Sequence, residues 1–328
     1  MERERIKWID IAKGIGILLV IAGHTLNNFP RGFIFSFHMP LFFLLSAAAF
    51  TPSQNKDEFV SKAGKSFRRL VVPAIVITVA CFVLNFILNY KSLVLKDYII
   101  GCIGSLIFSS GVPVNFLGFN FQRIGIPWFL IVLFSGRTLF DYLHLKLKGK
   151  KLVIVICLCA IAGVVIGQIQ WLPFSFDITL AILPFLYAGY FTKRVDMHKT
   201  PIFYGILAMI FWLLSLNWCF LFGYTYLELT TRVYVIFPVC YITAICGSLF
   251  VSYIGVVTER FMVMRPLIYL GKNSMYLLWV HCFDEYFISL WNYPGNLYIS
   301  MVIRIVLDIA IFAALMGALH LIKKLKKQ

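Results

Sequence analysis

Long apolar stretches separated by short polar connections make up most of the chain. A helix needs roughly 17–25 mostly apolar residues to cross a bilayer, and ten stretches have about that length. Another apolar segment, at 97–111, is short and rich in Gly and Ser, which favours an interfacial or re-entrant piece over an eleventh span. The pattern predicts an all-α integral membrane protein with about ten transmembrane helices, at residues 9–27, 33–50, 70–89, 127–143, 152–170, 177–192, 201–219, 234–257, 266–288 and 297–321.

Composition supports the same class. The 328 residues are 61% hydrophobic and only 13% charged, which excludes a soluble globular domain. The net charge of +16 is typical of a nucleic-acid-binding protein only when the basic residues cover one soluble surface, whereas here they cluster between apolar stretches. We therefore expect a single transmembrane domain over residues 1–328, with membrane lipids around it, no appended soluble domain and no nucleic-acid partner.

The distribution of Lys and Arg predicts the orientation. Alternate connections and both termini together hold 21 of these residues, and the opposite set of connections holds five. Cytoplasmic loops carry the excess of positive charge in membrane proteins. The sequence therefore predicts that both termini are cytoplasmic.

The first apolar stretch carries three ionisable residues, Asp10, Lys13 and His24. A helix turns about 100° per residue, so Lys13 and His24 lie within roughly 20° of each other and about 16 Å apart along the axis. Asp10 lies beside them, and Gly14 and Gly16 flank the stripe, where we expect them to leave room. This face predicts one wall of a polar passage from the inner to the outer leaflet.

A simpler interpretation of this face remains open. Asp10 and Lys13 could form a pair that snorkels to the inner surface, and His24 could be wetted by the outer headgroups. Ionisable residues inside a membrane more often face a functional cavity, and the alignment of these three favours that interpretation.

Further polar residues recur at the depth of His24. The second span contains FHMPLFF, in which Pro40 predicts a kink just after His38, and the ninth contains GKNSMYLLWVH, which ends at His281. A histidine can take a proton from a hydroxyl and return it to a leaving group, and a carboxylate on its other nitrogen fixes the tautomer. A zinc site is the rival, but no paired metal-ligand motif supports it, and we expect no metal. For His38 and His281, a buried structural role with hydrogen bonds across helices is a third interpretation. The carboxylates expected near this depth are Glu228, Asp284 and Glu285.

The connection before the third span ends in KAGKSFRR, with Lys62, Lys65, Arg68 and Arg69. Arginine forks bind phosphate in a bidentate manner, so this segment is a candidate phosphate clamp. An ordinary positive-inside anchor explains the same residues.

Two further ion pairs are predicted from spacing alone. Arg304 and Asp308 lie four residues apart on the last span, and Arg137 and Asp141 have the same spacing on the fourth. Residues at this spacing are neighbours on a helix surface. We expect each pair to neutralise itself.

These residues together resemble the acyltransferase-3 family of bacterial membrane O-acyltransferases. The resemblance begins with Asp-x-x-Lys followed ten residues later by His, and it covers nearly the whole chain. Its later stretches, in order, are FHMPLFFLLSA at 37–47, RRLVVP at 68–73, PWFL at 127–130, LPFLYAGYFTKR at 183–194 and GKNSMYLLWVH at 271–281.

The resemblance implies transfer of an acyl group, commonly acetyl, from cytoplasmic acetyl-CoA or another acyl-CoA to a sugar hydroxyl. The acceptor would be a cell-envelope polysaccharide or a lipid-linked saccharide, and the location a bacterial cytoplasmic membrane. His24 would be catalytic, either as general base or as acylated nucleophile. The expected site comprises His24 and Asp10 for catalysis, Lys13, Lys65, Arg68 and Arg69 for the acyl-CoA donor, and His38, Trp128, His281 and Glu228 for the substrate.

Two other functions remain in view. A polytopic exporter of a glycan or its precursor would also have a polar passage, but the sequence has no duplicated halves. A sensory bundle with histidines as a pH switch explains the charges but not their alignment on one helix face.

Overall fold

The structure is a helical bundle with one small hairpin. It is a computed structural model that describes residues 6–116, 118–223 and 225–325. The hairpin pairs β1 (Val114–Phe116) with β2 (Phe119–Phe121) in antiparallel register. The helices are α1 (Lys7–Gly23), α2 (Asn28–Phe35), α3 (His38–Ala48), α4 (Lys56–Asn89), α5 (Leu95–Phe108), α6 (Trp128–Lys146), α7 (Gly149–Ile169), α8 (Phe176–Ala181), α9 (Leu183–Thr192), α10 (Ile202–Gly223), α11 (Val239–Thr258), α12 (Arg265–Lys272), α13 (Ser274–Asp284) and α14 (Leu297–Leu325), and the short 3₁₀ turns are η1 (Tyr90–Ser92), η2 (Pro173–Ser175), η3 (Met262–Met264) and η4 (Glu285–Leu290).

The helices confirm an all-α membrane protein. Within the described residues, six helical segments are long and apolar enough to cross a bilayer, namely α2 with α3, α4, α7, α10, α11 and α14. A seventh candidate is the pair α8 and α9, whose axes bend by 51°. The remaining expected spans fold as α1, α6 and the pair α12 and α13. The count of about ten spans stays a prediction.

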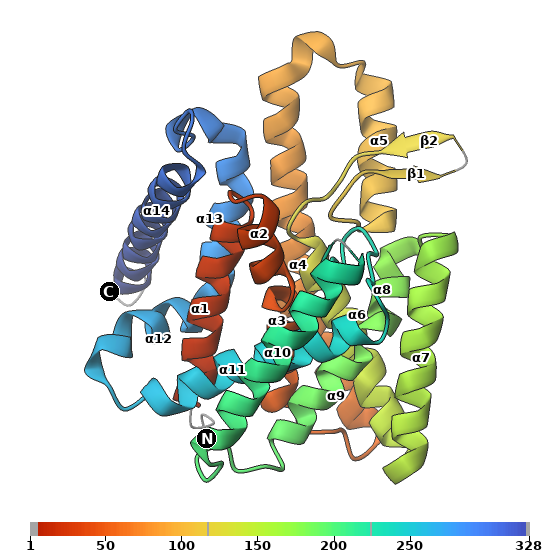
Figure 1. Cartoon of the computed structure of the whole chain (residues 1–328). Helices are drawn as coiled ribbons and strands as arrows, with labels where there is room; N and C mark the ends of the chain where they lie inside the picture. The colour runs from red at the N-terminus through yellow and green to blue at the C-terminus, as the bar shows by residue number, and fades with distance from the viewer. Residues whose placement is uncertain (1–5, 117, 224, 326–328) are drawn as a thin grey trace.

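Residues 97–111, expected as an interfacial or re-entrant piece, fall mostly within α5. Its 14 residues extend for about 21 Å, less than the thickness of a hydrocarbon core. Figure 1 shows α5 beside the far end of α4, both standing above the rest of the bundle. A role at the interface therefore stays a prediction for this helix.

The helix α1 lies inside the bundle, packed against α3, α11 and α12. A Cβ on Gly14 would lie 2.3 Å from the backbone oxygen of Leu267, and one on Gly271 would collide with the backbone of Asp10. These two glycines bring α1 and α12 into backbone contact. The expectation that Gly14 and Gly16 leave room beside the polar stripe is wrong, because a Cβ on Gly16 would likewise lie only 3.0 Å from the Phe42 ring.

The second span is broken between α2 and α3. Pro40 lacks the N–H that would bond to the carbonyl of Ser36, and the chain leaves helical geometry at Phe37. The kink therefore comes just before His38 rather than after it. Trp212 on α10 donates its indole N–H to the Ser36 hydroxyl at 3.0 Å, which ties the break to the bundle.

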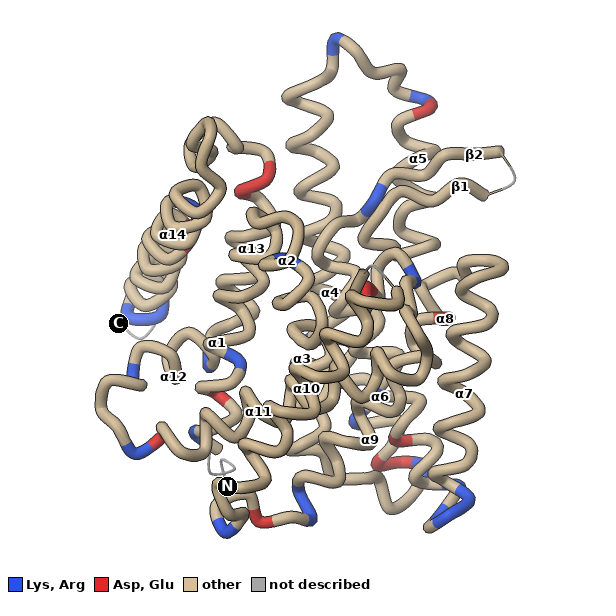
Figure 2. The backbone as a smooth tube through the Cα atoms, in the orientation of Figure 1, with Lys and Arg blue, Asp and Glu red and all other residues tan. Residues whose placement is uncertain are grey.

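The outermost helix is α14, which contacts mainly α1 and α13. Its buried residues are Ser300, Arg304, Asp308 and Phe312, spaced four apart along one face. Three of these four are polar, so the last span turns a polar stripe toward the bundle. Figure 2 shows Lys and Arg concentrated toward the lower part of the view, on the side of the N-terminus.

Candidate active site

One cavity of about 660 Å³ connects the two ends of the bundle. Asp10, Lys13 and His24 all line it, as the shared helix face predicts. On α6 the lining extends from Trp128 to Asp141, a distance of about 20 Å along the helix axis. This length is about two thirds of the roughly 30 Å thickness of a hydrocarbon core.

The end of the cavity near the start of α4 is rich in cations. Lys62, Lys65 and Arg69 on α4 line it, together with Arg137 on α6 and Lys272 at the end of α12. We call these five residues the cationic end. Arg68, which the sequence also predicted for the donor, is exposed and does not line the cavity.

The opposite end contains imidazoles and carboxylates. His24, His38, Arg31, Glu228 and Glu285 line it, and we call these five residues the histidine end. Two ion pairs stand there, with Arg31 3.5 Å from Glu228 and Arg123 2.9 Å from Glu285. Trp128 also lines the cavity, and its indole lies against Gly111.

The rings of the histidine end form a continuous row. The imidazole of His24 lies edge-on to Phe35, with centroids 6.0 Å apart, and Phe35 lies 4.4 Å from the His38 ring. The Nδ1 of His38 is 3.2 Å from the carbonyl oxygen of Ile34. Since this contact occupies one nitrogen of His38, the more accessible imidazole is that of His24, which is exposed to the cavity.

His281 does not line the cavity and lies directly behind His24. Its side chain is fully buried, and the two imidazole centroids are 5.4 Å apart in an edge-on arrangement. Its Nδ1 is 3.0 Å from a carboxylate oxygen of Asp284 and 3.1 Å from one of Asp308. His281 therefore contacts His24 and does not reach the cavity, and the substrate contact expected for it stays a prediction.

Comparison with known proteins decides the family. The sequence matches the acyltransferase domain of the acyltransferase-3 family over residues 6–320, nearly the whole chain. The chain belongs to the acyltransferase-3 family. No curated protein and no solved structure matches it. The protein is thus an acyltransferase built from membrane helices.

The buried ion pairs of this acyltransferase differ from those predicted by spacing. Arg304 bonds to both carboxylate oxygens of Asp284, at 2.6 Å from Nε, rather than to Asp308. The pairing expected for Arg304 and Asp308 is wrong because α13 brings a closer carboxylate to the guanidinium. Arg304 also reaches the Thr25 hydroxyl, next to His24, at 3.3 Å.

Asp141 likewise has a different partner from the predicted one. It accepts hydrogen bonds from the backbone N–H and the hydroxyl of Ser53, at 2.8 and 2.7 Å. The Arg137 guanidinium lies 6.0 Å from the Phe50 ring. Arg137 and Asp141 therefore both line the cavity without forming the close ion pair that their spacing predicted.

The trio of His281, Asp284 and Asp308 has the residue types of a metal site, with potential ligand atoms within 4.8 Å of one another. Arg304 already binds both oxygens of Asp284. A guanidinium in that position opposes a metal cation, because it takes the lone pairs and adds a like charge. We therefore interpret the trio as part of an ion-pair network.

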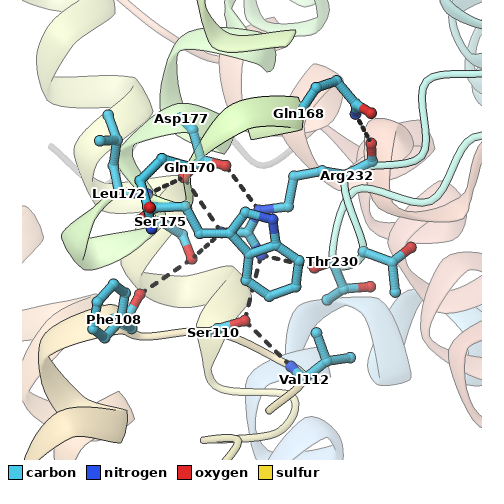
Figure 3. Close-up of polar contacts among 12 residues, drawn as sticks. Phe108, Ser110, Val112, Gln168, Gln170, Leu172, Ser175, Asp177, Thr230 and Arg232 are labelled. Atoms are coloured by element: carbon cyan, nitrogen blue, oxygen red, sulfur yellow. Dashed lines mark hydrogen bonds and ion pairs between the residues drawn. The ribbon is translucent and has the colours of Figure 1, made fainter. Parts of the chain in front are cut away.

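A second buried ion pair, shown in Figure 3, has no counterpart in the sequence-based predictions. Arg232 and Asp177 are almost fully buried, and the Arg232 Nε lies 2.8 Å from the carboxylate. Its guanidinium stacks on the Trp171 ring at 3.9 Å and donates to the Thr230 carbonyl at 2.8 Å. The side chain of Gln168 binds the Arg232 carbonyl.

This ion pair holds the loop that carries Glu228 and Thr230 into the cavity. In the sequence, Arg232 looked like one of a few basic residues in outer connections. The feature of the sequence that could have indicated a buried ion pair is Asp177. This acidic residue stands at the start of an apolar stretch and has no nearby cation in the sequence. Intramembrane carboxylates call for a partner, but its position 55 residues away could not be predicted.

Proposed function

We propose that the protein is an O-acyltransferase that moves an acyl group, with acetyl as the expected one, from cytoplasmic acyl-CoA to a sugar hydroxyl. The acceptor is a cell-envelope polysaccharide or a lipid-linked saccharide. The observation that carries this proposal is the cavity, which has cations at one end and the exposed imidazole of His24 at the other.

The cationic end suits the donor. Acyl-CoA carries several phosphate groups, and Lys and Arg bind phosphate through charge-assisted hydrogen bonds. Lys65 and Arg69 lie where the phosphates would be held, and Lys13 lies further along the cavity toward His24. The reactive thioester at the end of the pantetheine arm is uncharged and would extend past Lys13 to the histidine end. Arg68, outside the cavity, would act only through the long-range field.

The histidine end suits the chemistry. In direct transfer, His24 takes the proton of the sugar hydroxyl while its oxygen attacks the thioester carbonyl carbon. The bond from that carbon to sulfur breaks, and the proton passes to the departing thiolate. In the two-step alternative, a His24 nitrogen attacks the thioester carbon, the carbon–sulfur bond breaks, and CoA leaves as the thiolate. The sugar hydroxyl oxygen then takes the acyl group from His24, and the hydroxyl proton passes to the thiolate. Asp10 is grouped with Lys13 on α1, about 21 Å from His24 along the axis, so we assign it to the donor side.

The acceptor would enter at the histidine end. Glu228 and Glu285 offer acceptors for sugar hydroxyls, His38 and Trp128 line the same space, and Arg31 and Arg123 hold the carboxylates by ion pairs. With the termini cytoplasmic, this end faces outward, in a bacterial cytoplasmic membrane.

The experiment is transfer of label from radiolabelled acetyl-CoA to candidate glycans by purified protein. We expect His24→Ala to abolish transfer, with His320→Ala as control, because His320 is exposed on α14 and away from the cavity. Both variants should elute as wild type in size-exclusion chromatography. Label transfer by His24→Ala at the wild-type rate would refute the role of His24, and glycan flux without modification would support the exporter.

A further inference from the structure

The contacts of His281 determine which of its two ring nitrogens carries a hydrogen. Two carboxylates face the Nδ1 of His281, and carboxylate oxygens accept hydrogen bonds, so Nδ1 carries the hydrogen and donates it. In a neutral imidazole the other nitrogen, Nε2, is then an acceptor. We infer that His281 is neutral, because Arg304 already binds both oxygens of Asp284 and supplies the positive charge that this carboxylate needs. His281 then presents an acceptor on the side away from its carboxylates.

This acceptor is buried and lacks a partner within the described part of the chain. A buried polar atom without a hydrogen bond costs free energy, so its environment is expected to supply a donor. The His24 and His281 rings lie with their centroids 5.4 Å apart, which is close enough for one nitrogen of each ring to reach hydrogen-bonding distance when the two nitrogens face each other. The N–H of His24 is therefore the natural donor.

We propose that His281 is the positioning residue of His24. Its Nε2 accepts the N–H of His24, which fixes the tautomer and leaves the lone pair of the other His24 nitrogen directed at the cavity. This inference rests on the proposed function. When that nitrogen takes the proton of the sugar hydroxyl, Asp284 and Asp308 stabilise the imidazolium through His281, until the proton leaves with the thiolate.

The surrounding charges keep this arrangement rigid. Arg304 on α14 holds Asp284 and reaches Thr25, so the chain on both sides of the histidine pair is fixed. The other charged or titratable groups facing the two rings are Asp308 on α14, His38 on α3 and Arg31 on α2. Asp308 contacts His281 through one carboxylate oxygen, 3.1 Å from Nδ1.

Two substitutions separate positioning from packing. His281→Phe keeps a flat ring and removes the acceptor, whereas His281→Gln keeps an acceptor oxygen. We expect His281→Phe to lower kcat roughly 100-fold at unchanged KM for acetyl-CoA, since general-base catalysis contributes that much. The acid limb of its pH profile should move to lower pH, because the His24 imidazolium loses stabilisation. His281→Gln should recover part of kcat, and His320→Phe, on the exposed face of α14, should match wild type.

A measurement without turnover tests the same proposal. Nitrogen-15 NMR of the His24 imidazole should show one fixed protonated nitrogen in wild type and a tautomer mixture in His281→Phe. If wild type transfers no acyl group, the proposed function fails while this spectrum still tests the pair. Unchanged kcat and acid limb in His281→Phe, or identical spectra, would overturn the proposal. If His281→Phe does not fold, His281→Leu, which also removes the acceptor, takes its place in both comparisons.

Discussion

At the scale of single residues, neighbours four positions apart predict contacts poorly in this bundle. Arg304 and Asp308 have ideal spacing, yet Arg304 pairs with Asp284 and Asp308 with His281. The difference arises because α13 brings its carboxylate within 2.6 Å of the guanidinium, where no solvent competes. The packing between helices decides which buried groups form pairs, and the spacing of residues within one helix carries no information about that packing.

The two arginines at the start of the third span give a prediction at this scale. Arg69 lines the cavity and Arg68 is exposed outside it, although they are adjacent in the sequence. We expect Arg69→Ala to weaken acetyl-CoA binding about tenfold, since a hydrogen bond between charged groups contributes about 1.5–3 kcal/mol. Arg68→Ala should weaken it much less. Isothermal titration calorimetry of the two variants makes the comparison, and equal losses would return both residues to the role of membrane anchors.

At the scale of elements, the sequence predicted the features that depend on one helix alone. The face shared by Asp10, Lys13 and His24 follows from the geometry of one helix, and all three line one cavity. A break close to Pro40 could be predicted because its cause is local, although the break falls before His38 and not after it. Gly14 was misjudged because its role depends on Leu267 of α12, a partner more than 250 positions away.

The ion pair of Arg232 and Asp177 joins the loop before α11 to the start of α8, so we expect it to stabilise the packing of these elements. We expect Arg232→Met to destabilise the protein by about 3–5 kcal/mol, because it leaves a buried carboxylate without its counter-charge. Lys199→Met breaks an exposed pair with Asp196 and should cost less than about 1 kcal/mol.

Thermal unfolding in detergent measures both variants. Adding Asp177→Asn to Arg232→Met should recover part of the loss, because the neutral amide needs no counter-charge. Equal midpoints for Arg232→Met and Lys199→Met would show that the buried pair does not hold the loop.

At the scale of the whole molecule, one cavity joins the cationic end, where we propose that the donor binds, to the histidine end, where we propose that the acyl group is transferred. Cations from α4, α6 and α12 line one end, and the histidine pair with its carboxylates stands at the other. Such a passage lets a charged donor stay at one face of the membrane while its thioester reacts near the opposite face. The acyl group would then cross most of the bilayer without its carrier crossing.

The most direct test of this account uses sealed inverted membrane vesicles, with the acceptor glycan inside and labelled acetyl-CoA outside. Wild-type protein should label the enclosed glycan, His24→Ala should not, and His320→Ala should match wild type. Label on the glycan only when donor and acceptor are on the same side, or undiminished labelling by His24→Ala, would contradict transfer through the cavity.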